Sequence, residues 1–105
     1  MVEVISEQEA AARRLLKDLR GEIDAIDDRL VDLLAARLGV VERVIAIKTD
    51  AGIPALLPDR VEEVVARVRS RAQDTGLPPD LSEKLWRTLI QWTIDYEDAR
   101  LGRDG

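Results

Sequence analysis

The chain has 105 residues, no cysteine and no histidine, and a formal net charge of -5 at pH 7. This composition excludes disulfides, thiol nucleophiles, an imidazole base and the usual zinc sites, and the mixing of acidic with basic residues excludes the basic stripe of a nucleic-acid-binding protein. We expect no metal and no cofactor. The length supports a single domain, residues 1–105, whose core is marginal unless association adds to it.

The N-terminal stretch MVEVISEQEA lacks the basic region and apolar core of a secretory signal. No uninterrupted apolar run approaches the ~20 residues that a membrane-spanning helix needs. We therefore predict a cytoplasmic protein that binds neither membranes nor nucleic acid.

The first predicted helix spans about residues 6–49. Ser6 followed by Glu9 matches a capping box, and no proline interrupts the pattern before the helix ends. At ~1.5 Å per residue this helix is about 60 Å long. Two shorter helices of the same chain cannot cover so long an apolar stripe. We therefore predict a homodimer in which two long helices pack side by side.

A loop at 50–57 separates this helix from a second one. Pro58 suits the first turn of a helix over about 58–75, and Gly76 is placed to end it. β-Branched residues are plentiful here, but they fall at helical rather than alternating spacing. The predicted fold class is therefore all-α.

The third helix is predicted over about 80–101, after the rigid LPPD linker, with Asp80 or Ser82 as its cap. A helical wheel gives this segment two adjacent apolar faces. The first face consists of Leu81, Leu85, Leu89, Trp92 and Tyr96, and the second of Trp86, Ile90, Thr93, Glu97 and Leu101. Glu97 is the polar exception on the second face.

Two cations occupy the centre of the apolar stripe of the first helix. At about 100° per residue, Arg37 and Lys48 fall among the stripe residues, and Arg20 falls at the edge of the same face. The stripe consists of Ile23, Ile26, Leu30, Leu33, Leu34, Val41 and Val44. Burying unpaired charge is costly, so either internal carboxylates or an anionic ligand should pair with these cations. Alternatively, their long stems reach solvent or acidic groups at a dimer interface.

The segment LRGEIDAIDDRLVDLLAARLGVVERVIAIK resembles the first helix of the all-helical (type II) chorismate mutases. In that family an Arg within LR.EID.ID is followed by an Arg 17 residues later and a Lys 11 residues after that, a pattern that Arg20, Arg37 and Lys48 match. Arg60 matches a fourth cation just inside the second helix. The resemblance implies an intertwined dimer in which Arg20 reaches into the partner's site.

The reaction of this family is a [3,3] rearrangement that requires neither acid nor base, so the composition is no obstacle to it. The resemblance implies that the arginines clamp the two carboxylates of the substrate, while Lys48 stabilises charge on its ether oxygen. Glu97 stands where many members have a Gln that donates to this oxygen, and Thr93 lies at a nearby hydroxyl position. Apolar surroundings favour a neutral Glu97 and Lys48 favours a charged one; we hypothesise that Glu97 is protonated in the working enzyme.

Two positions depart from members that recognise the C4 hydroxyl of chorismate. Those members typically have acidic residues where this chain has Leu57 and Val61. The stretch GIPALLPDRV, together with Glu97, resembles relatives that rearrange 4-amino-4-deoxychorismate, where an ionised Glu97 could instead pair with the substrate ammonium. The stretches IPA...P.RV and IQWTI are also similar to isochorismate pyruvate lyases, which give salicylate. We favour the mutase.

A hypothesis of another class is a helical dimer with no catalysis of its own, or one that depends on a shikimate-pathway enzyme as partner. The complete cation set argues against a pure scaffold, which would not need it. Ligand binding discriminates these hypotheses, because a dicarboxylate that binds the folded state must raise its melting temperature.

Overall fold

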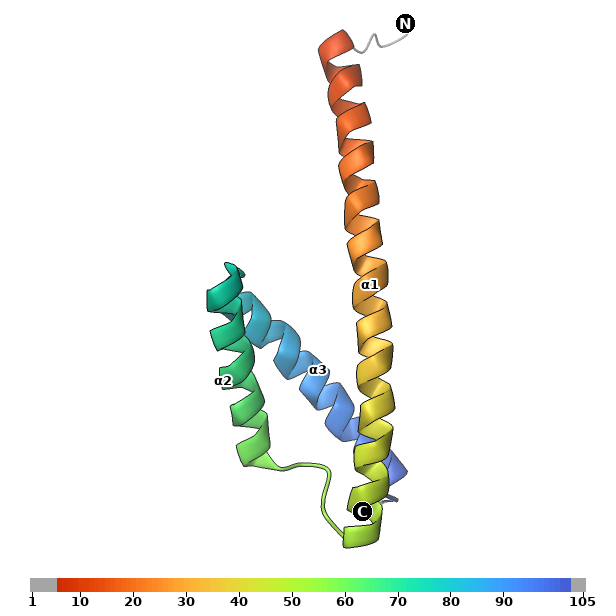
Figure 1. The fold of residues 1–105 in the computed structure, drawn as a ribbon, viewed down its shortest axis with the longest axis vertical. Helices are drawn as coiled ribbons and strands as arrows, with labels where there is room; N and C mark the ends of the chain where they lie inside the picture. Colours follow the sequence, from red (N-terminus) through yellow and green to blue (C-terminus); the bar gives the residue numbers. More distant parts are fainter. Residues whose placement is uncertain (1–5, 103–105) are drawn as a thin grey trace, which may run out of the picture. The chain divides into compact units, whose positions relative to one another are not determined.

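The computed structural model describes residues 6–102, which form three α-helices and no strand (Figure 1). The helices are α1 (Glu7–Ala51), α2 (Pro58–Thr75) and α3 (Pro79–Arg100). The prediction of an all-α chain with three helices is confirmed. Part of the stretch from which we argued against a signal segment, residues 1–5, lies outside the described residues.

The chain divides into two compact units, Met1–Gly39 and Val40–Gly105, and α1 runs through both. The predicted capping box is present at its start, where the backbone N–H of Glu9 donates to Ser6 Oγ at 3.1 Å. At its other end α1 continues two residues beyond the predicted boundary. Gly52 then adopts a φ of 70°, in the left-handed region that a glycine enters without strain, and ends the helix.

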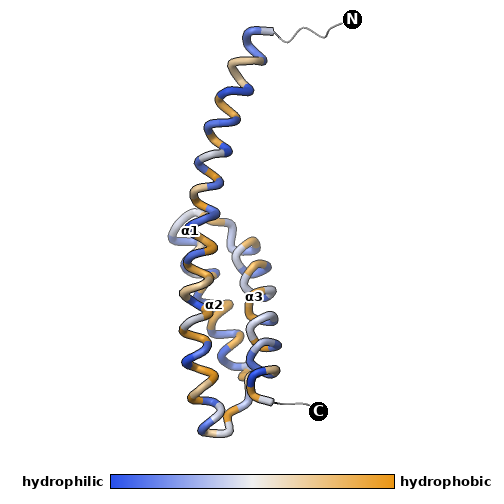
Figure 2. The backbone as a smooth tube through the Cα atoms, turned by 90° about the vertical axis from the view of Figure 1, so that its right-hand side faces the viewer, coloured by the Kyte–Doolittle hydropathy of each residue, from blue (hydrophilic) through white to orange (hydrophobic). Residues whose placement is uncertain are grey.

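The apolar stripe of the N-terminal unit is exposed. Hydrophobic and hydrophilic residues alternate along the turns of α1 (Figure 2). The side chains of Leu30 and Leu33 on this helix are 52% and 66% exposed. A single helix offers its own apolar side chains nothing to pack against. None of the helices in the described part of the chain combines the length and the hydrophobicity of a membrane-spanning segment.

The C-terminal unit has a core of its own, in which α2 packs beside α3 (Figures 1 and 2). The buried apolar residues of the described chain are Ile45, Ala55, Val65, Ala72 and Ile90. Helix α2 ends as predicted at Gly76, with φ 81°, and the N–H of Leu77 donates back to the Ala72 carbonyl at 2.9 Å.

The predicted cap of α3 is wrong. The helix begins at Pro79 with Pro78 as the capping residue, and no side chain caps it. Proline suits this position because its fixed φ is helical and it has no N–H to satisfy. Ser82 lies inside the first turn instead, where its buried hydroxyl donates to the Pro79 carbonyl at 2.8 Å.

Of the two apolar faces of α3, the second is the buried one. Ile90, Thr93 and Glu97 are buried within the C-terminal unit, whereas Leu85 and Trp92 of the first face are exposed. Hydrophobicity alone does not distinguish the two faces, because both are apolar. The packing of α2 and the end of α1 decides which one forms the core.

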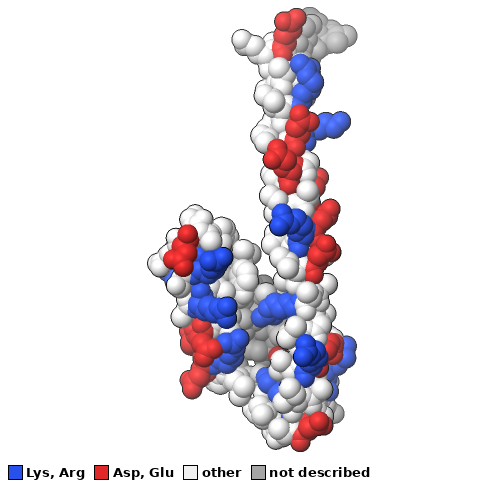
Figure 3. All heavy atoms as spheres, in the orientation of Figure 1, with Lys and Arg blue, Asp and Glu red and all other residues white. Residues whose placement is uncertain are grey.

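Ion pairs near the surface join α2 to α3, and Figure 3 shows side chains of both charges gathered over this part of the molecule. Arg69 pairs with Asp80 and Glu83, each at 2.9 Å. Arg87 pairs with Glu83 at 2.7 Å and with Glu62 at 3.0 Å. Hydrogen bonds from Arg87 lower the pKa values of both Glu62 and Glu83. This network reinforces the pairing of the two helices at the surface.

Candidate active site

The centre of the candidate site is a buried ion pair between α1 and α3. Lys48 Nζ lies 2.9 Å from Glu97 Oε1, and the two side chains are only 11% and 9% exposed. Lys48 comes from the last turns of α1 and Glu97 from the last turn of α3. Helical periodicity places both on the buried faces of their helices, so the two polar ends meet inside an apolar unit.

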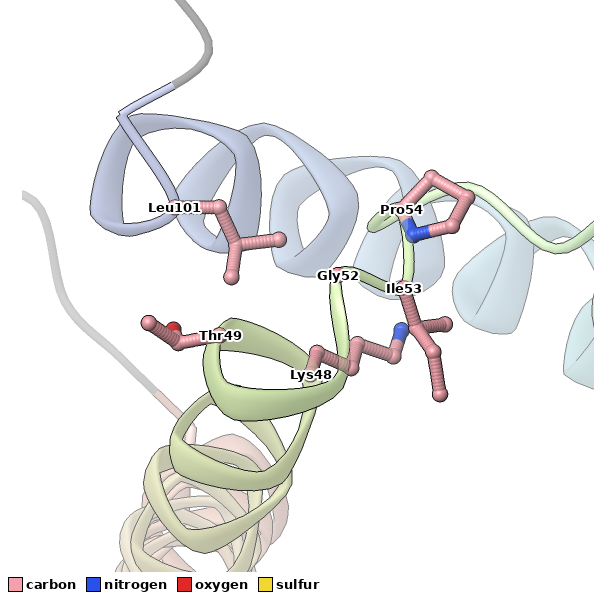
Figure 4. A pocket seen from close by; sticks show the side chains of 6 residues that line it. All are labelled: Lys48, Thr49, Gly52, Ile53, Pro54 and Leu101. Carbon is pink, nitrogen blue, oxygen red and sulfur yellow. The ribbon is translucent and has the colours of Figure 1, made fainter.

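The loop between α1 and α2 supplies a second acceptor to Lys48. Its ammonium donates to the carbonyl oxygen of Ala55 at 3.0 Å. Ala55 is itself buried, which fixes this carbonyl in place. In Figure 4 the Lys48 side chain extends from α1 with its nitrogen beside Ile53 of the same loop.

A cavity of about 180 Å³ lies next to Lys48. It is lined by Lys48, Thr49, Gly52, Ile53, Pro54 and Leu101 (Figure 4). Lys48 is the one predicted site residue in this lining. The cavity therefore touches the candidate site from the side of the loop and does not contain its other groups.

Thr93 lies one helical turn before Glu97 on the same buried face. Its hydroxyl donates to the carbonyl of Leu89 at 2.8 Å, which is the usual bond of a threonine to the preceding turn of its own helix. The position predicted for a small hydroxyl near Glu97 is thus occupied by a buried one.

Three further predicted site residues stand at the start of α2. The side chain of Arg60 is 59% exposed, and its guanidinium pairs with Glu63 one turn later. Leu57 is the exposed residue that precedes the helix, and Val61 is half-buried in its first turn. Arg60 therefore forms no bond to Lys48 or Glu97 here.

The remaining two predicted cations belong to the N-terminal unit. Arg20 is exposed and Arg37 is half-buried on α1. The structure brings together Lys48 and Glu97 among the predicted residues, and the roles of Arg20 and Arg37 stay predictions.

Comparison with known proteins assigns the family. The family model described as Chorismate mutase type II matches residues 19–98. The chain belongs to this family. The matched segment contains all four predicted cations and Glu97, and it begins about three turns inside α1.

The sequence of this chorismate mutase family chain is similar to those of several other proteins. A T-protein of Enterobacter agglomerans is 40% identical over 85 residues, which cover 81% of this chain and 23% of that protein. 4-Amino-4-deoxychorismate mutases of Streptomyces venezuelae and Streptomyces pristinaespiralis are each 32% identical, over 85% and 91% of this chain and 86% and 74% of their own lengths. The chain thus spans less than a quarter of the T-protein.

Sequence reasoning missed two features of this chorismate mutase fold. The first is the Ala55 carbonyl, a backbone atom that no side-chain pattern could reveal. The second is a cluster in which the Tyr96 hydroxyl donates to Glu42 and accepts from Arg100 Nη2 at 2.6 Å. Arg100 lies 4.7 Å above the Tyr96 ring, which also stacks on Trp92 at 5.0 Å between centroids. Trp92, Tyr96 and Arg100 are four residues apart in the sequence, and this spacing could have predicted their contacts on one face of α3.

This cluster anchors α3 beside Glu97. Tyr96 is the neighbour of Glu97 in the chain, and its partner Glu42 lies on α1, as Lys48 does. The hydrogen bond from its hydroxyl to Glu42 raises the pKa of Tyr96, because ionisation would remove the shared proton and set two negative charges against each other. Three polar contacts, Lys48–Glu97, Tyr96–Glu42 and Arg100–Glu42, therefore hold the end of α3 to α1.

Proposed function

We propose that this chain catalyses the [3,3] rearrangement of a chorismate-type dicarboxylate, and that the preferred substrate is 4-amino-4-deoxychorismate, giving 4-amino-4-deoxyprephenate. The observation that supports this best is the buried ammonium of Lys48, held by two acceptors on separate elements. A buried cation in a fixed position suits charge that develops on an ether oxygen as its bond breaks. The rearrangement needs no proton transfer, so a site without histidine or cysteine is sufficient.

The arginines complete the proposed site. Arg37 and Arg60 bind the substrate carboxylates, for which a guanidinium offers two parallel N–H groups. Arg60 must leave Glu63 to do so. That exposed pair is worth little, because solvent screens it, so a dianionic substrate can displace it.

The choice of substrate rests on the start of α2. Leu57 and Val61 flank Arg60 and carry no group that could bond to a C4 hydroxyl. A site without such a partner cannot favour chorismate over analogues that lack the C4 hydroxyl. The similarity to two proteins named 4-amino-4-deoxychorismate mutase supports the same choice.

We further propose a homodimer in which the exposed stripe of α1 packs against its counterpart. Its apolar side chains have no cover in the N-terminal unit, and association removes such surface from water. In this arrangement the partner's Arg20 contributes to each site.

The first experiment offers the purified protein equimolar chorismate, isochorismate and 4-amino-4-deoxychorismate, with products followed by chromatography and mass spectrometry against a protein-free control. Isomerisation of 4-amino-4-deoxychorismate ahead of the other two supports the proposal. If chorismate is isomerised first, the proposed reaction stands but the preferred substrate is chorismate. Pyruvate with salicylate from isochorismate establishes the lyase instead, and no loss above the control favours a dimer that depends on a partner enzyme or has no catalysis.

Lys48→Met tests the residue that carries the proposal. Losing one electrostatic contact to the reacting oxygen should lower kcat by about 10²–10³-fold. Arg43→Met is the matched control, since Arg43 is an exposed cation on the opposite face of α1. Equal activity of the two variants contradicts the assignment of Lys48.

A further inference from the structure

Glu42 of α1 holds two side chains from the end of α3. Its carboxylate accepts a hydrogen bond from the hydroxyl of Tyr96 and pairs with Nη1 of Arg100 at 3.4 Å. Arg100 also donates to the Tyr96 hydroxyl at 2.6 Å and lies 4.7 Å above its ring. Each of these three side chains therefore contacts the other two, and we call the triangle of Glu42, Tyr96 and Arg100 the α3 clamp.

The α3 clamp and the Lys48–Glu97 pair join the same two helices at different points. Glu42 and Lys48 are six residues apart on α1, which is about 9 Å along the axis of an α-helix. Tyr96 and Glu97 are consecutive on α3, and consecutive side chains leave a helix about 100° apart. A single contact would leave α3 free to pivot about it. Two contacts at separate points fix both the rotation of α3 about its own axis and its angle to α1.

Side chains carry this connection because the backbones of α1 and α3 stay apart. Helix α3 packs closely on α2, whereas no such close backbone approach joins it to α1 within residues 6–102. The orientation of α3 relative to the C-terminal part of α1 therefore depends in large part on the long polar side chains near the end of α3.

The α3 clamp lies outside the group of residues proposed to meet the substrate. The side chains of Glu42 and Arg100 are 40% and 54% exposed, and Tyr96 also stacks on Trp92. The clamp nevertheless holds the last turn of α3, which carries Glu97 on the buried face of the helix. It can therefore act on the reaction only through the position of this helix.

We infer that the α3 clamp is a positioning device for the reaction, which sets the direction in which α3 presents Thr93 and Glu97 to the substrate. This inference rests on the proposed function. The rearrangement depends on holding the substrate in a compact reactive conformer, so a small displacement of one wall of the site lowers the rate. The three clamp residues are thus positioning residues that do not touch the substrate.

Tyr96→Phe tests the clamp, because it removes the hydroxyl and keeps the ring that stacks on Trp92. On the substrate that the unaltered chain isomerises fastest, kcat should fall about tenfold and KM should change less than about threefold, since no contact to the substrate is lost. Gln91→Ala is the matched control, because the Gln91 amide donates to Asp95 on the same helix at 3.0 Å and not to α1. An equal kcat in the two variants overturns the inference.

Rescue and coupling separate positioning from a general loss of stability. Glu42→Gln keeps an acceptor oxygen for the Tyr96 hydroxyl and should retain most of the activity that Glu42→Ala loses. The double variant Glu42→Ala with Tyr96→Phe should be about as slow as Glu42→Ala alone, since both substitutions break the same contact. Additive effects on kcat, or a Glu42→Gln variant as slow as Glu42→Ala, contradict the clamp.

Amide hydrogen exchange without substrate keeps this inference separate from the proposed function. In Tyr96→Phe the amides of residues 93–98 should exchange faster than in Gln91→Ala, because the end of α3 opens more often. An increase spread equally over all three helices would indicate a loss of global stability and overturns the inference. Absence of turnover on all three substrates refutes the proposed function, whereas unchanged exchange at residues 93–98 in a chain that does turn over refutes the clamp.

Discussion

The two units of this chain differ in whether their apolar side chains are buried. The C-terminal unit folds three segments around its own core, with Val65 and Ile90 buried among them. The N-terminal unit is one stretch of helix whose stripe, including Ile23 and Leu30, is exposed. The same residue types and the same helical spacing therefore give a core in one unit and an uncovered face in the other.

This difference shows what each unit needs in order to be stable. Backbone hydrogen bonds alone hold an isolated helix only marginally in water, and most helical stability comes from packing of the apolar face. The C-terminal unit obtains that packing from its own chain. In the proposed homodimer the N-terminal unit obtains this packing from another copy, and the predictions below test this contrast.

The largest expected effect comes from placing a charge on the exposed stripe. Leu30→Asp should weaken the proposed dimer by about 3–6 kcal/mol, or about 10²–10⁴-fold in Kd, because burying one leucine is worth about 1.5–3 kcal/mol and two-fold symmetry places it in the interface twice. Sedimentation velocity over a range of concentrations measures the change.

Ala25→Asp is the control for this prediction. Ala25 is also exposed and, five residues before Leu30, lies on the far side of the same helix, so its substitution adds the same charge away from the stripe. If both variants stay as associated as the unaltered chain, the stripe is not the interface. If both dissociate equally, charge rather than the apolar stripe determines association.

The core of the C-terminal unit gives the next largest effect. Ile90→Ala should lower the free energy of unfolding by about 2–5 kcal/mol through lost burial and the cavity left behind. Unlike the effect of Leu30→Asp, this loss should not depend on protein concentration. Urea unfolding measures it, with Thr88→Ala on the exposed face of α3 as the control. A loss no larger than that of the control contradicts the assignment of Ile90 to the core.

The sequence predicted the helices well because their boundaries depend on local signals. The bounds of α2, the Ser6 capping box and the glycine end at Gly76 follow from residues close in the sequence. The cap of α3 was mispredicted because two prolines began the helix before the polar candidates. Residues next to each helix end thus determine where the helix begins or stops, also at the start of α3, which was predicted wrongly.

The candidate site was predictable only in part. Periodicity placed Lys48 and Glu97 on buried faces, but their contact depends on how α3 packs against α1. The Ala55 carbonyl has no signal in the sequence, since every residue has one. The pairing of Arg60 with Glu63 was also missed, because an exposed side chain chooses among neighbours of nearly equal energy.

The exposed network between α2 and α3 should contribute less than the core. Arg87 lowers the pKa values of Glu62 and Glu83, whose ordinary value is 4.5. A carboxylate with a lowered pKa stabilises the fold above its ordinary value, and this stability is lost as the pH falls through the lowered pKa. Arg87→Ala should therefore lower the melting temperature at pH 7 slightly and make it less sensitive to acid. Salt should weaken the same effect.

The control for the network is Arg71→Ala, an exposed cation elsewhere on α2. It should leave the acid sensitivity of the melting temperature unchanged. A melting temperature that falls with acid equally in Arg87→Ala and in the unaltered chain would mean that the network does not govern acid stability.

The smallest expected effect lies at alkaline pH and concerns Tyr96, the only tyrosine of the chain. Because its pKa is raised above the ordinary value of 10.0 by the hydrogen bond to Glu42, its neutral form contributes stability that is present below this value and is lost as the pH rises through the raised pKa. The ultraviolet absorbance of tyrosinate reports this titration directly. Glu42→Gln should move the titration back toward the ordinary value and reduce the alkaline loss of stability, since no negative charge then opposes ionisation. An unchanged titration in Glu42→Gln would show that burial, and not the hydrogen bond to Glu42, raises the pKa of Tyr96.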